Sequence, residues 1–239
     1  MTGTILNVLT AIIGGVLGTR LGARLPEKVR ETVMHGLGLL TTVIGVQMAL
    51  TTRNLLIVLA SILVGGIVGE WWRIDDRLNA LGKTLEERFA RDGETGNFTH
   101  GFVIASLVFC VGPLAILGSI QDGLLGDFNL IAIKSVLDGF AGLAFASTLG
   151  IGVAFAALTV LVYQGGISVA AMLLGGAIGT VTRETPWVIE MTATGGVLIM
   201  GIGLILLDLR RVRVANLLPA IFIAPLIVVI WGVLGFRLP

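Results

Sequence analysis

Long runs without charged residues alternate with short polar connections along most of this chain. The longest run extends from Gly139 to Thr182 and contains no Asp, Glu, Lys or Arg. At about 1.5 Å of rise per residue, a helix over this run is long enough for two crossings of a hydrocarbon core about 30 Å thick. A helix of a soluble domain needs one polar face for water, which this run does not offer. The pattern therefore predicts an all-α fold, a polytopic bundle of transmembrane helices.

Hydropathy divides the chain into about nine apolar segments, so roughly eight to ten membrane crossings are expected. The segments cover residues 4–22, 33–51, 54–72, 98–121, 129–146, 147–164, 166–182, 188–208 and 214–236. We expect one integral membrane domain over residues 1–239, because the polar remainder is too short to bury a core of its own.

The one long polar stretch, Arg73–Asn97, has the pattern of an amphipathic helix. Apolar residues recur in it at three- and four-residue steps, namely Ile74, Leu78, Leu81, Leu85 and Phe89. Such a helix has one apolar and one charged face, so it lies on the membrane surface or packs under the bundle. We expect residues 73–97 to form a cytoplasmic linker of this kind rather than a second domain.

The basic residues predict an orientation. Two connections are rich in them: the loop after the first segment has Arg20, Arg24, Lys28 and Arg30, and the polar linker has Arg73, Arg77, Lys83, Arg88 and Arg91. The loop between these two connections has Arg53 alone. Cytoplasmic loops carry an excess of Lys and Arg, so both basic connections are predicted to be cytoplasmic and the N-terminus outside. The start of the chain lacks a basic region before its apolar run, which favours a retained first helix over a cleaved signal peptide.

The last third of the chain echoes the first third. Three pairs of stretches correspond: Ala11–Thr19 with Met172–Thr180, Gly38 and Ile44–Gly45 with Gly196 and Ile202–Gly203, and Asn54–Leu56 with Asn216–Leu218. We therefore expect a three-helix repeat over residues 4–72 and 166–236, with a central broken-helix region over residues 98–165. Apolar, glycine-rich helices also resemble one another by composition, so chance similarity is the alternative.

The charges of the two copies predict that the repeat is inverted. In the last copy the basic cluster Arg210, Arg211 and Arg213 follows the second helix, whereas in the first copy the basic loop follows the first helix. Inverted repeats are common in secondary transporters. Inversion requires an even number of crossings between Phe98 and Gly165, where hydropathy suggests three. Either one central segment is re-entrant, two are broken halves, or nine plain crossings leave Arg210–Arg213 outside the rule.

Composition narrows the function classes. Hydrophobic residues make up 55% of the chain, charged residues 13%, and the mean hydropathy is +0.99, which excludes a water-soluble globular protein. The net charge of +1 does not suggest a nucleic-acid partner. One cysteine, Cys110, and two histidines, His35 and His100, do not form a metal signature or a catalytic pair. We expect no cofactor and no enzymatic activity.

The central region departs from a plain apolar bundle. Gly112-Pro113 interrupts the fourth segment, and proline frees backbone carbonyls inside a helix. Polar residues follow the break, among them Ser119, Gln121 and Asp122. Freed carbonyls at membrane depth must be buried in protein or line a water-filled cavity. This region is the predicted transport or ion-binding site.

Lys134 and Asp138 belong to the same predicted site. They are four residues apart, so they share one helical face and can neutralise each other. Ionisable groups in the membrane mark function by default, because each costs about 2.5 kcal/mol or more at a helix centre. The alternative is that the pair satisfies only itself or reaches the surface. The predicted site residues are Asp122, Lys134, Asp138, Gln121, Ser119 and Pro113, with the two carboxylates facing one cavity and any metal ligand left open.

Small and amide residues predict helix contacts. Asn7 and Gln47 can form hydrogen bonds between helices. Gly-xxx-Gly steps indicate close helix packing within the bundle or between copies in a homo-oligomer; they are Gly14/Gly18, Gly18/Gly22, Gly65/Gly69 and Gly175/Gly179.

Four stretches of the chain resemble a known family. They are Gly3–Asn7 (GTILN), Gly69–Trp72 (GEWW), Gly112–Gly123 (GPLAILGSIQDG) and Lys134–Phe140 (KSVLDGF). Together they resemble the bacterial membrane family called domain of unknown function 554, over nearly the whole chain. The resemblance implies a bacterial inner-membrane protein and brings no established activity. More loosely, Leu137–Ala141 is similar to the Asp-Ala helices of small cation exporters, although Gly139 replaces the usual alanine and the segment count is larger.

These observations favour a membrane transporter for a small solute or cation, surrounded by the lipid bilayer. A non-catalytic structural or partner-binding membrane protein and an ion channel are the alternatives. A structural protein needs no broken polar centre, so substitutions of Asp122, Lys134 and Asp138 separate these classes. The solute, the coupling ion and the direction of transport are left open.

Overall fold

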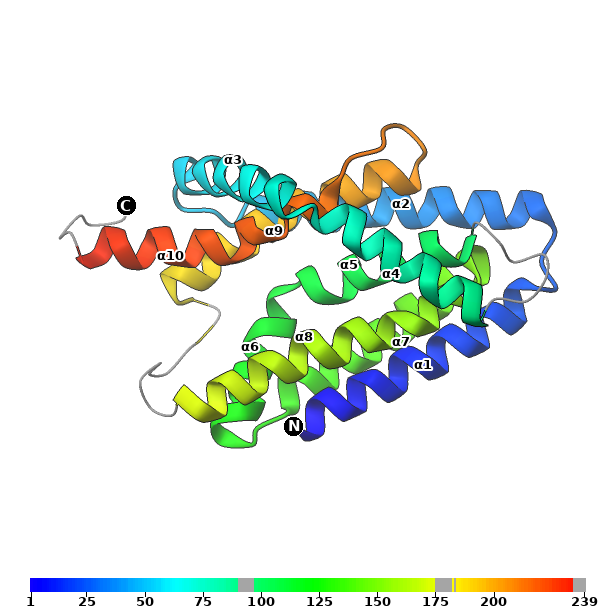
Figure 1. Ribbon diagram of the computed structural model, residues 1–239, viewed down its shortest axis with the longest axis horizontal. Helices are drawn as coiled ribbons and strands as arrows, with labels where there is room; N and C mark the ends of the chain where they lie inside the picture. Colours follow the sequence, from blue (N-terminus) through cyan, green and yellow to red (C-terminus); the bar gives the residue numbers. More distant parts are fainter. Residues whose placement is uncertain (90–96, 175–181, 183, 234–239) are drawn as a thin grey trace. The chain divides into compact units, whose positions relative to one another are not determined.

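The structure is a computed structural model that describes residues 1–89, 97–174, 182 and 184–233. Within these residues every regular element is a helix (Figure 1). In chain order they are α1 (Thr2–Gly22), α2 (Glu27–Ala49), α3 (Leu55–Trp72), α4 (Ile74–Phe89), α5 (Asn97–Val111), α6 (Pro113–Leu125), α7 (Asn129–Leu149), α8 (Gly152–Leu174), α9 (Pro186–Leu206), the 3₁₀ helix η2 (Val214–Leu217) and α10 (Pro219–Val233). The predicted all-α fold is confirmed.

Seven helices of the described chain are long and apolar enough to cross a membrane. Helices α5 and α6 pass the same test only as a pair, bent by 63° at the break between Val111 and Pro113. Pro113 is the first residue of α6, where its fixed φ suits a helix start and its missing N–H costs no bond. The described residues therefore contain up to eight crossings, the lower end of the expected range.

The expected segments 147–164 and 166–182 are wrong as two separate segments. Helix α8 runs unbroken through Gly165 and Gly166, and the turn before it lies at Gly150 instead. Gly150 has φ +80°, a left-handed conformation that glycine adopts without strain. Gly165 lies where side chains of α1 approach, with Met1 and Thr4 atoms 3.7 and 3.9 Å from the position of a Cβ. A Cβ on Gly166 would meet no described atom within 4 Å, and α8 continues through both glycines, so neither marks a turn.

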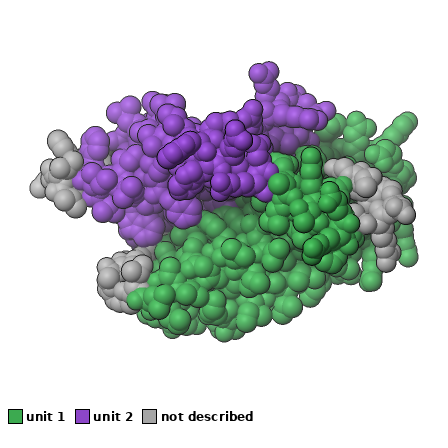
Figure 2. All heavy atoms as spheres, viewed as in Figure 1, with its two compact units in different colours: residues 1–37, 78–110, 114–180 green, residues 38–77, 111–113, 181–239 purple. Residues whose placement is uncertain are grey.

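The chain forms two compact units (Figure 2). Unit 1 comprises residues 1–37, 78–110 and 114–180, and unit 2 comprises residues 38–77, 111–113 and 181–239.

In unit 1, helix α1 packs against α7 and α8. Gly14, Gly18 and Gly22 touch the backbone of α7 at successive turns, the first at Gly139 and the last at Ser147, so α1 and α7 run parallel. A Cβ on any of the three would collide with an α7 carbonyl group. Two of the predicted Gly-xxx-Gly seams are therefore packing surfaces within the chain, while Gly175/Gly179 lies outside the described residues.

Helices α5 and α6 follow α8 in the same direction from one end to the other. A Cβ on Gly152, at the start of α8, would lie 2.7 Å from the carbonyl carbon of Phe98 in α5. Further along, the hydroxyls of Ser106 and Thr159 are 2.9 Å apart. Near the end of α8, Ser168 Oγ donates to the Ser119 carbonyl of α6 at 3.0 Å. The bent pair thus accompanies α8 over about 24 Å, close to the thickness of a hydrocarbon core.

The predicted amphipathic helix is present as α4. In unit 1 its Gly82 packs against Thr99 and Phe102 of α5, and the ring of Phe89 lies 5.1 Å from that of Phe155 in α8. Phe155 is in the first turn of α8, so this part of α4 packs at the end of the bundle where α5 and α8 begin. Arg91, which was predicted to be part of the linker, lies outside the described residues.

In unit 2, close helix packing again depends on glycine. Gly65 and Gly69 of α3 pack against Ala220 and Asn216 respectively, so α3 and α10 are antiparallel. The part of α2 from Gly38 onward packs against α9 through glycines on both helices.

Candidate functional site

Lys134 and Asp138 form a buried ion pair on one face of α7. Their side chains are only 5% and 10% exposed. The predicted spacing effect is confirmed, because residues four apart on a helix face the same direction. The ring of Phe109 from α5 lies below the ammonium group, 6.0 Å from Nζ to the ring centroid, where a cation–π attraction applies.

Two amide side chains from other helices complete this cluster. Asn7 of α1 donates through Nδ2 to Asp138 Oδ2 at 3.0 Å and to Gln164 Oε1 at 3.2 Å. Gln164 comes from α8, and both amides have no exposed surface. Asp138 Oδ2 therefore accepts from both Lys134 and Asn7, and Asn7 connects this carboxylate of α7 to Gln164 of α8. We call Asn7, Lys134, Asp138 and Gln164 the central network.

Asp138 and Gln164 of the central network lie near the middle of their helices, whereas Asn7 and Lys134 lie in the second turn of α1 and α7. Asp138 is about 14 Å along α7 from Asn129, and Gln164 is about 18 Å along α8 from Gly152. The two helices have 21 and 23 residues, so both side chains are close to the midpoint. A charge at this depth is far from the headgroup layer, where polar groups cost little.

The network and its surroundings carry unpartnered polar atoms. Among the described residues, Asn7 Oδ1, Gln164 Nε2 and Thr4 Oγ1 are buried without a hydrogen-bond partner. Thr4 belongs to α1, one turn before Asn7, and is 1% exposed. Buried polar groups are nearly always paired, so these atoms are open to a ligand or a water molecule.

Asp122 has different partners. It is 3% exposed in α6, and its oxygens accept from the Met1 amine at 2.9 Å and the Gly3 N–H at 3.2 Å. Its contacts on α1 precede Asn7 by about one turn, roughly 6 Å along the axis. Asp122 is close to the end of α6 (Leu125), whereas Asp138 is at mid-helix. That both carboxylates line one cavity stays a prediction.

The remaining predicted site residues are on α6. Ser119 is buried, donates to Ala115 O at 2.6 Å, and accepts from Ser168 through its carbonyl. Gln121 is half-buried. Pro113 begins the helix after the break and forms no part of the central network. The structure thus brings Lys134 and Asp138 together directly and connects Asp122 to the same helix that carries Asn7.

Comparison with known proteins identifies the family of this chain. The family described as "Protein of unknown function (DUF554)" matches residues 2–229. The chain belongs to the DUF554 family. It is 29% identical over 242 residues to "Uncharacterized membrane protein YdfK" of Bacillus subtilis (strain 168), a match that covers 99% of this chain and all of that protein. It is 28% identical over 226 residues to "Uncharacterized protein YqgA" of Escherichia coli (strain K12), covering 93% of this chain and 94% of that protein. No solved structure matches the chain.

The family resemblance is therefore confirmed, and DUF554 membership supports a membrane location, since a relative is described as a membrane protein. Charged residues in this DUF554 chain did not predict Gln164 of the central network or the neighbouring Thr4. Gln164 is an isolated amide in the long charge-free run, and Thr4 has an ordinary hydroxyl near the chain start. A search for lone amides inside apolar runs would have found Gln164, because an amide at membrane depth needs a partner from another helix.

Proposed function

We propose that the protein is a membrane transporter for a small solute or cation and not an enzyme, with the central network as its binding site. The observation that supports this proposal is the buried Lys134–Asp138 pair, whose carboxylate lies near the middle of α7 and is connected to two other helices through Asn7 and Gln164. Replacing a buried ion pair by apolar side chains is often neutral or stabilising, so stability alone does not call for this pair. Ionisable groups at this depth are typical of ion pathways and proton relays.

The geometry supports a displacement mechanism. Lys134 neutralises Asp138 in the structure described, so the carboxylate is held ready without a bound ligand. A cation or proton that takes Asp138 releases Lys134 from its partner. Asn7 Oδ1 and Thr4 Oγ1, one turn apart on α1, are buried oxygen atoms without a partner, and oxygen is the ligand that a hard cation prefers. The bound and unbound states then differ in which cation Asp138 holds, which gives two conformations that a ligand can shift.

A proposed topology follows from eight crossings. When α5 and α6 count as one crossing, the connections after α1, α3, α7 and α9 fall on the same side. These include the loop with Arg24 and the cluster Arg210–Arg213, so every strongly basic connection is on one side. The positive-inside rule makes that side the cytoplasm and places the N-terminus outside. We propose this orientation in the bacterial inner membrane.

This topology also supports the inverted repeat. The fusion of two expected segments into α8 leaves two crossings between α4 and α8, the even number that inversion needs. The glycine contacts between α2 and α9 in unit 2 agree with it. A Cβ on Gly196 would lie 2.6 Å from Gly45 O, and one on Gly203 would lie 3.1 Å from Gly38 O. In the repeat, Gly196 corresponds to Gly38 and Gly203 to Gly45. The two contacts are therefore equivalent under the repeat, as a pseudo-two-fold axis between α2 and α9 requires.

The direct test compares ligand responses and flux. Purified protein is screened for thermal shifts over pH, monovalent and divalent cations and amino acids, and the stabilising compound is then followed into proteoliposomes. We expect the wild type to respond to at least one compound and to transport it, and Asp138→Asn to lose both responses. Asp127→Asn is the matched control, because Asp127 is exposed outside the central network.

The structural or partner-binding alternative predicts a different outcome. If Lys134→Met/Asp138→Asn raises stability and the cell phenotype is unchanged, the pair serves no transport function and the proposal fails. Flux that saturates in the wild type favours a carrier, whereas flux that rises linearly with concentration favours an ion channel.

A further inference from the structure

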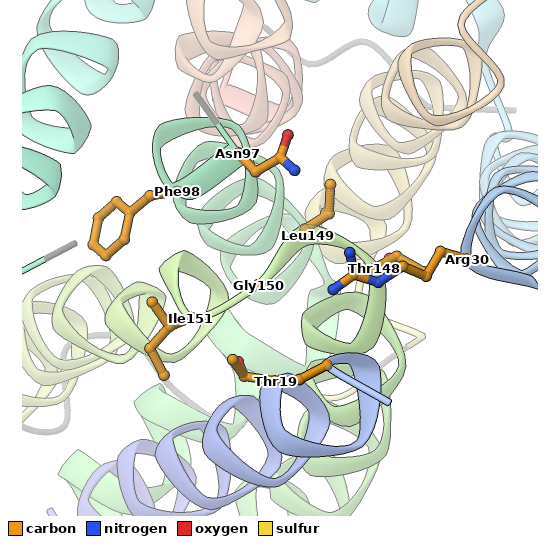
Figure 3. Close-up of a pocket in the computed structure, with 9 residues that line it drawn as sticks. Thr19, Arg30, Asn97, Phe98, Thr148, Leu149, Gly150 and Ile151 are labelled. Atoms are coloured by element: carbon orange, nitrogen blue, oxygen red, sulfur yellow. The ribbon is translucent and has the colours of Figure 1, made fainter. Parts of the chain in front are cut away.

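A pocket lies at the end of unit 1 where α1 and α7 end and α5 and α8 begin. Its volume is about 150 Å³, roughly five times the volume of one water molecule in the liquid. Its lining residues come from four helix ends and from α2; they are Thr19, Ala23, Arg30, Asn97, Phe98, Thr148, Leu149, Gly150 and Ile151 (Figure 3). The central network shares none of these residues.

Arg30 is the one charged residue among those that line the pocket. Its guanidinium extends from α2 toward Thr148 at the end of α7 (Figure 3). The Nε atom is buried and makes no hydrogen bond with any part of the chain that the structure describes. Among the described residues, the Glu27 carboxylate lies 3.8 Å from Nη1; the Arg30 side chain is 30% exposed and that of Glu27 is 88% exposed. A surface pair of this kind contributes little, so Arg30 is not neutralised inside the pocket.

The surroundings of Arg30 favour an anion. Ile151 lines the pocket directly before α8, whose N-terminus carries a partial positive charge, and the N–H groups of Val153 and Ala154 there already donate to the Gly150 and Ile151 carbonyls. Asn97 adds a side-chain amide at the start of α5. No carboxylate is among the described residues that line the pocket. Three further basic residues near the pocket, Arg20, Arg24 and Lys28, are exposed and raise the local concentration of anions.

We propose that this pocket binds a phosphate group through the Arg30 guanidinium. Arg presents a planar fork of donors that matches phosphate oxygens, and the end of α7 holds the fork in position through its partial negative charge. The pocket is at the ends of four membrane helices, so it lies at the depth of lipid headgroups. Basic pockets between transmembrane helices on the cytoplasmic side are typical sites for anionic lipid headgroups. A phospholipid headgroup and a free phosphate ion share this chemistry.

The test measures thermal unfolding of the full-length protein in neutral detergent micelles. Phosphatidylglycerol, phosphatidylcholine with the same acyl chains, and inorganic phosphate are added in separate arms. We expect phosphatidylglycerol to raise the Tm of the wild type by several degrees and Arg30→Gln to lose at least two thirds of that shift. Arg24→Gln is the matched control, since it removes an exposed charge from the same basic region without altering the pocket lining.

The arms distinguish the two sources of phosphate. A shift with phosphatidylglycerol alone identifies a lipid headgroup, and a shift with inorganic phosphate that Arg30→Gln abolishes identifies a soluble anion. Equal shifts in the wild type and Arg30→Gln overturn the site, as does a wild type that responds to neither. If Arg30→Gln does not fold, Asn97→Leu replaces it: at least a twofold weaker response supports the site, and an unchanged response rejects it. Transport through the central network can fail without affecting these results.

Discussion

Two buried acids, one in each unit, show how differently a membrane protein can hold a carboxylate. Asp138 of unit 1 is held by other side chains, Lys134 and Asn7, on two helices. Glu190 of unit 2 is held mostly by backbone: it accepts from the N–H groups of Arg53 and Asn54 at 2.8 and 3.1 Å, and from a threonine hydroxyl. Both residues are nearly inaccessible, at 7% and 2% exposure.

The difference separates a structural acid from a site acid. Glu190 is in the first turn or two of α9 and fastens the turn that precedes α3, whose start Asn54 caps by accepting from Leu56 N at 3.1 Å. Backbone donors cannot leave, so Glu190 has one stable arrangement. Asp138 depends on a flexible lysine and on an amide with an unpartnered oxygen, so its partners can be exchanged. A buried carboxylate with movable partners is the better candidate for a transported ion or proton.

Breaking the ion pair should have the largest effect. Lys134→Met leaves the Asp138 carboxylate buried without a charge partner, and we expect it to lower the free energy of unfolding by about 3–5 kcal/mol. Lys134→Met/Asp138→Asn should return to within about 1 kcal/mol of the wild type, because no charge is left unpaired. Chemical denaturation in mixed micelles measures both. A single variant no less stable than the double variant would show that the pair is not coupled.

Substitution of Glu190 should lower the free energy of unfolding by less than Lys134→Met does, and no second substitution should restore it. Glu190→Ala removes the acceptor of two backbone N–H groups and of Thr52, so we expect it to lower the free energy of unfolding by about 2–4 kcal/mol. Glu190→Gln keeps one carbonyl oxygen as acceptor and should cost about half as much. Both variants should transport normally once folded, if the acid is structural. If a fully folded Glu190 variant does not transport, Glu190 takes part in the mechanism and does not differ from Asp138 in role.

Interactions between residues close together in the sequence could be predicted from it, whereas interactions between distant residues could not. The Lys134–Asp138 pair and α4 follow from residues three or four apart, so helical periodicity alone was enough to predict them. The interruption at Pro113 is likewise local, because proline acts on its own helix. The Asn7–Gln164 bond joins residues 157 apart, so local patterns indicate that each amide needs a partner but do not identify that partner.

The one segment error has a similar cause. Gly165 and Gly166 are turn signals in isolation, but α8 continues through both of them, and the turn lies at Gly150, where φ is +80°. The pocket around Arg30 was also beyond reach, since five elements supply its lining. Helix existence was thus predictable from the chain, whereas the contacts between helices that build both sites were not.

Substitution of Gln164 distinguishes a role in ligand binding from a role in packing, because its expected effect on stability is slight. Gln164→Leu removes an acceptor of Asn7, and interhelical hydrogen bonds average about 0.6 kcal/mol. It also removes the unpartnered Nε2, so the net change in unfolding free energy should stay within about 1 kcal/mol. Transport should nevertheless fall at least tenfold if the amide positions Asn7 for the ligand. If stability and transport fall to the same extent, Gln164 is a packing residue. Gln164→Asn, which keeps an uncharged amide, is the conservative control.

The smallest effect is expected in unit 2 at Asp75, at the start of α4 outside the membrane-spanning helices. Burial and then the charge of Asp76 raise the pKa of the Asp75 carboxyl above its ordinary 3.8, against the opposing pull of Arg213. A raised pKa in the folded state means that folding favours the protonated acid. The contribution of Asp75 to stability is therefore greatest below pH 3.8 and declines as pH rises through the folded-state pKa.

Asp75→Asn should accordingly be slightly more stable than the wild type at neutral pH, by about 0.5 kcal/mol, since solvent screens a partly exposed group. The advantage should shrink as pH falls toward 3.8, where the wild-type acid becomes protonated as well. Thermal unfolding of both proteins from about pH 4 to pH 8 measures the difference. Asp76→Asn in the same series should reduce the advantage, because it removes the second cause of the raised pKa. An advantage that is constant over the whole pH range would trace the effect to packing and not to the charge of Asp75.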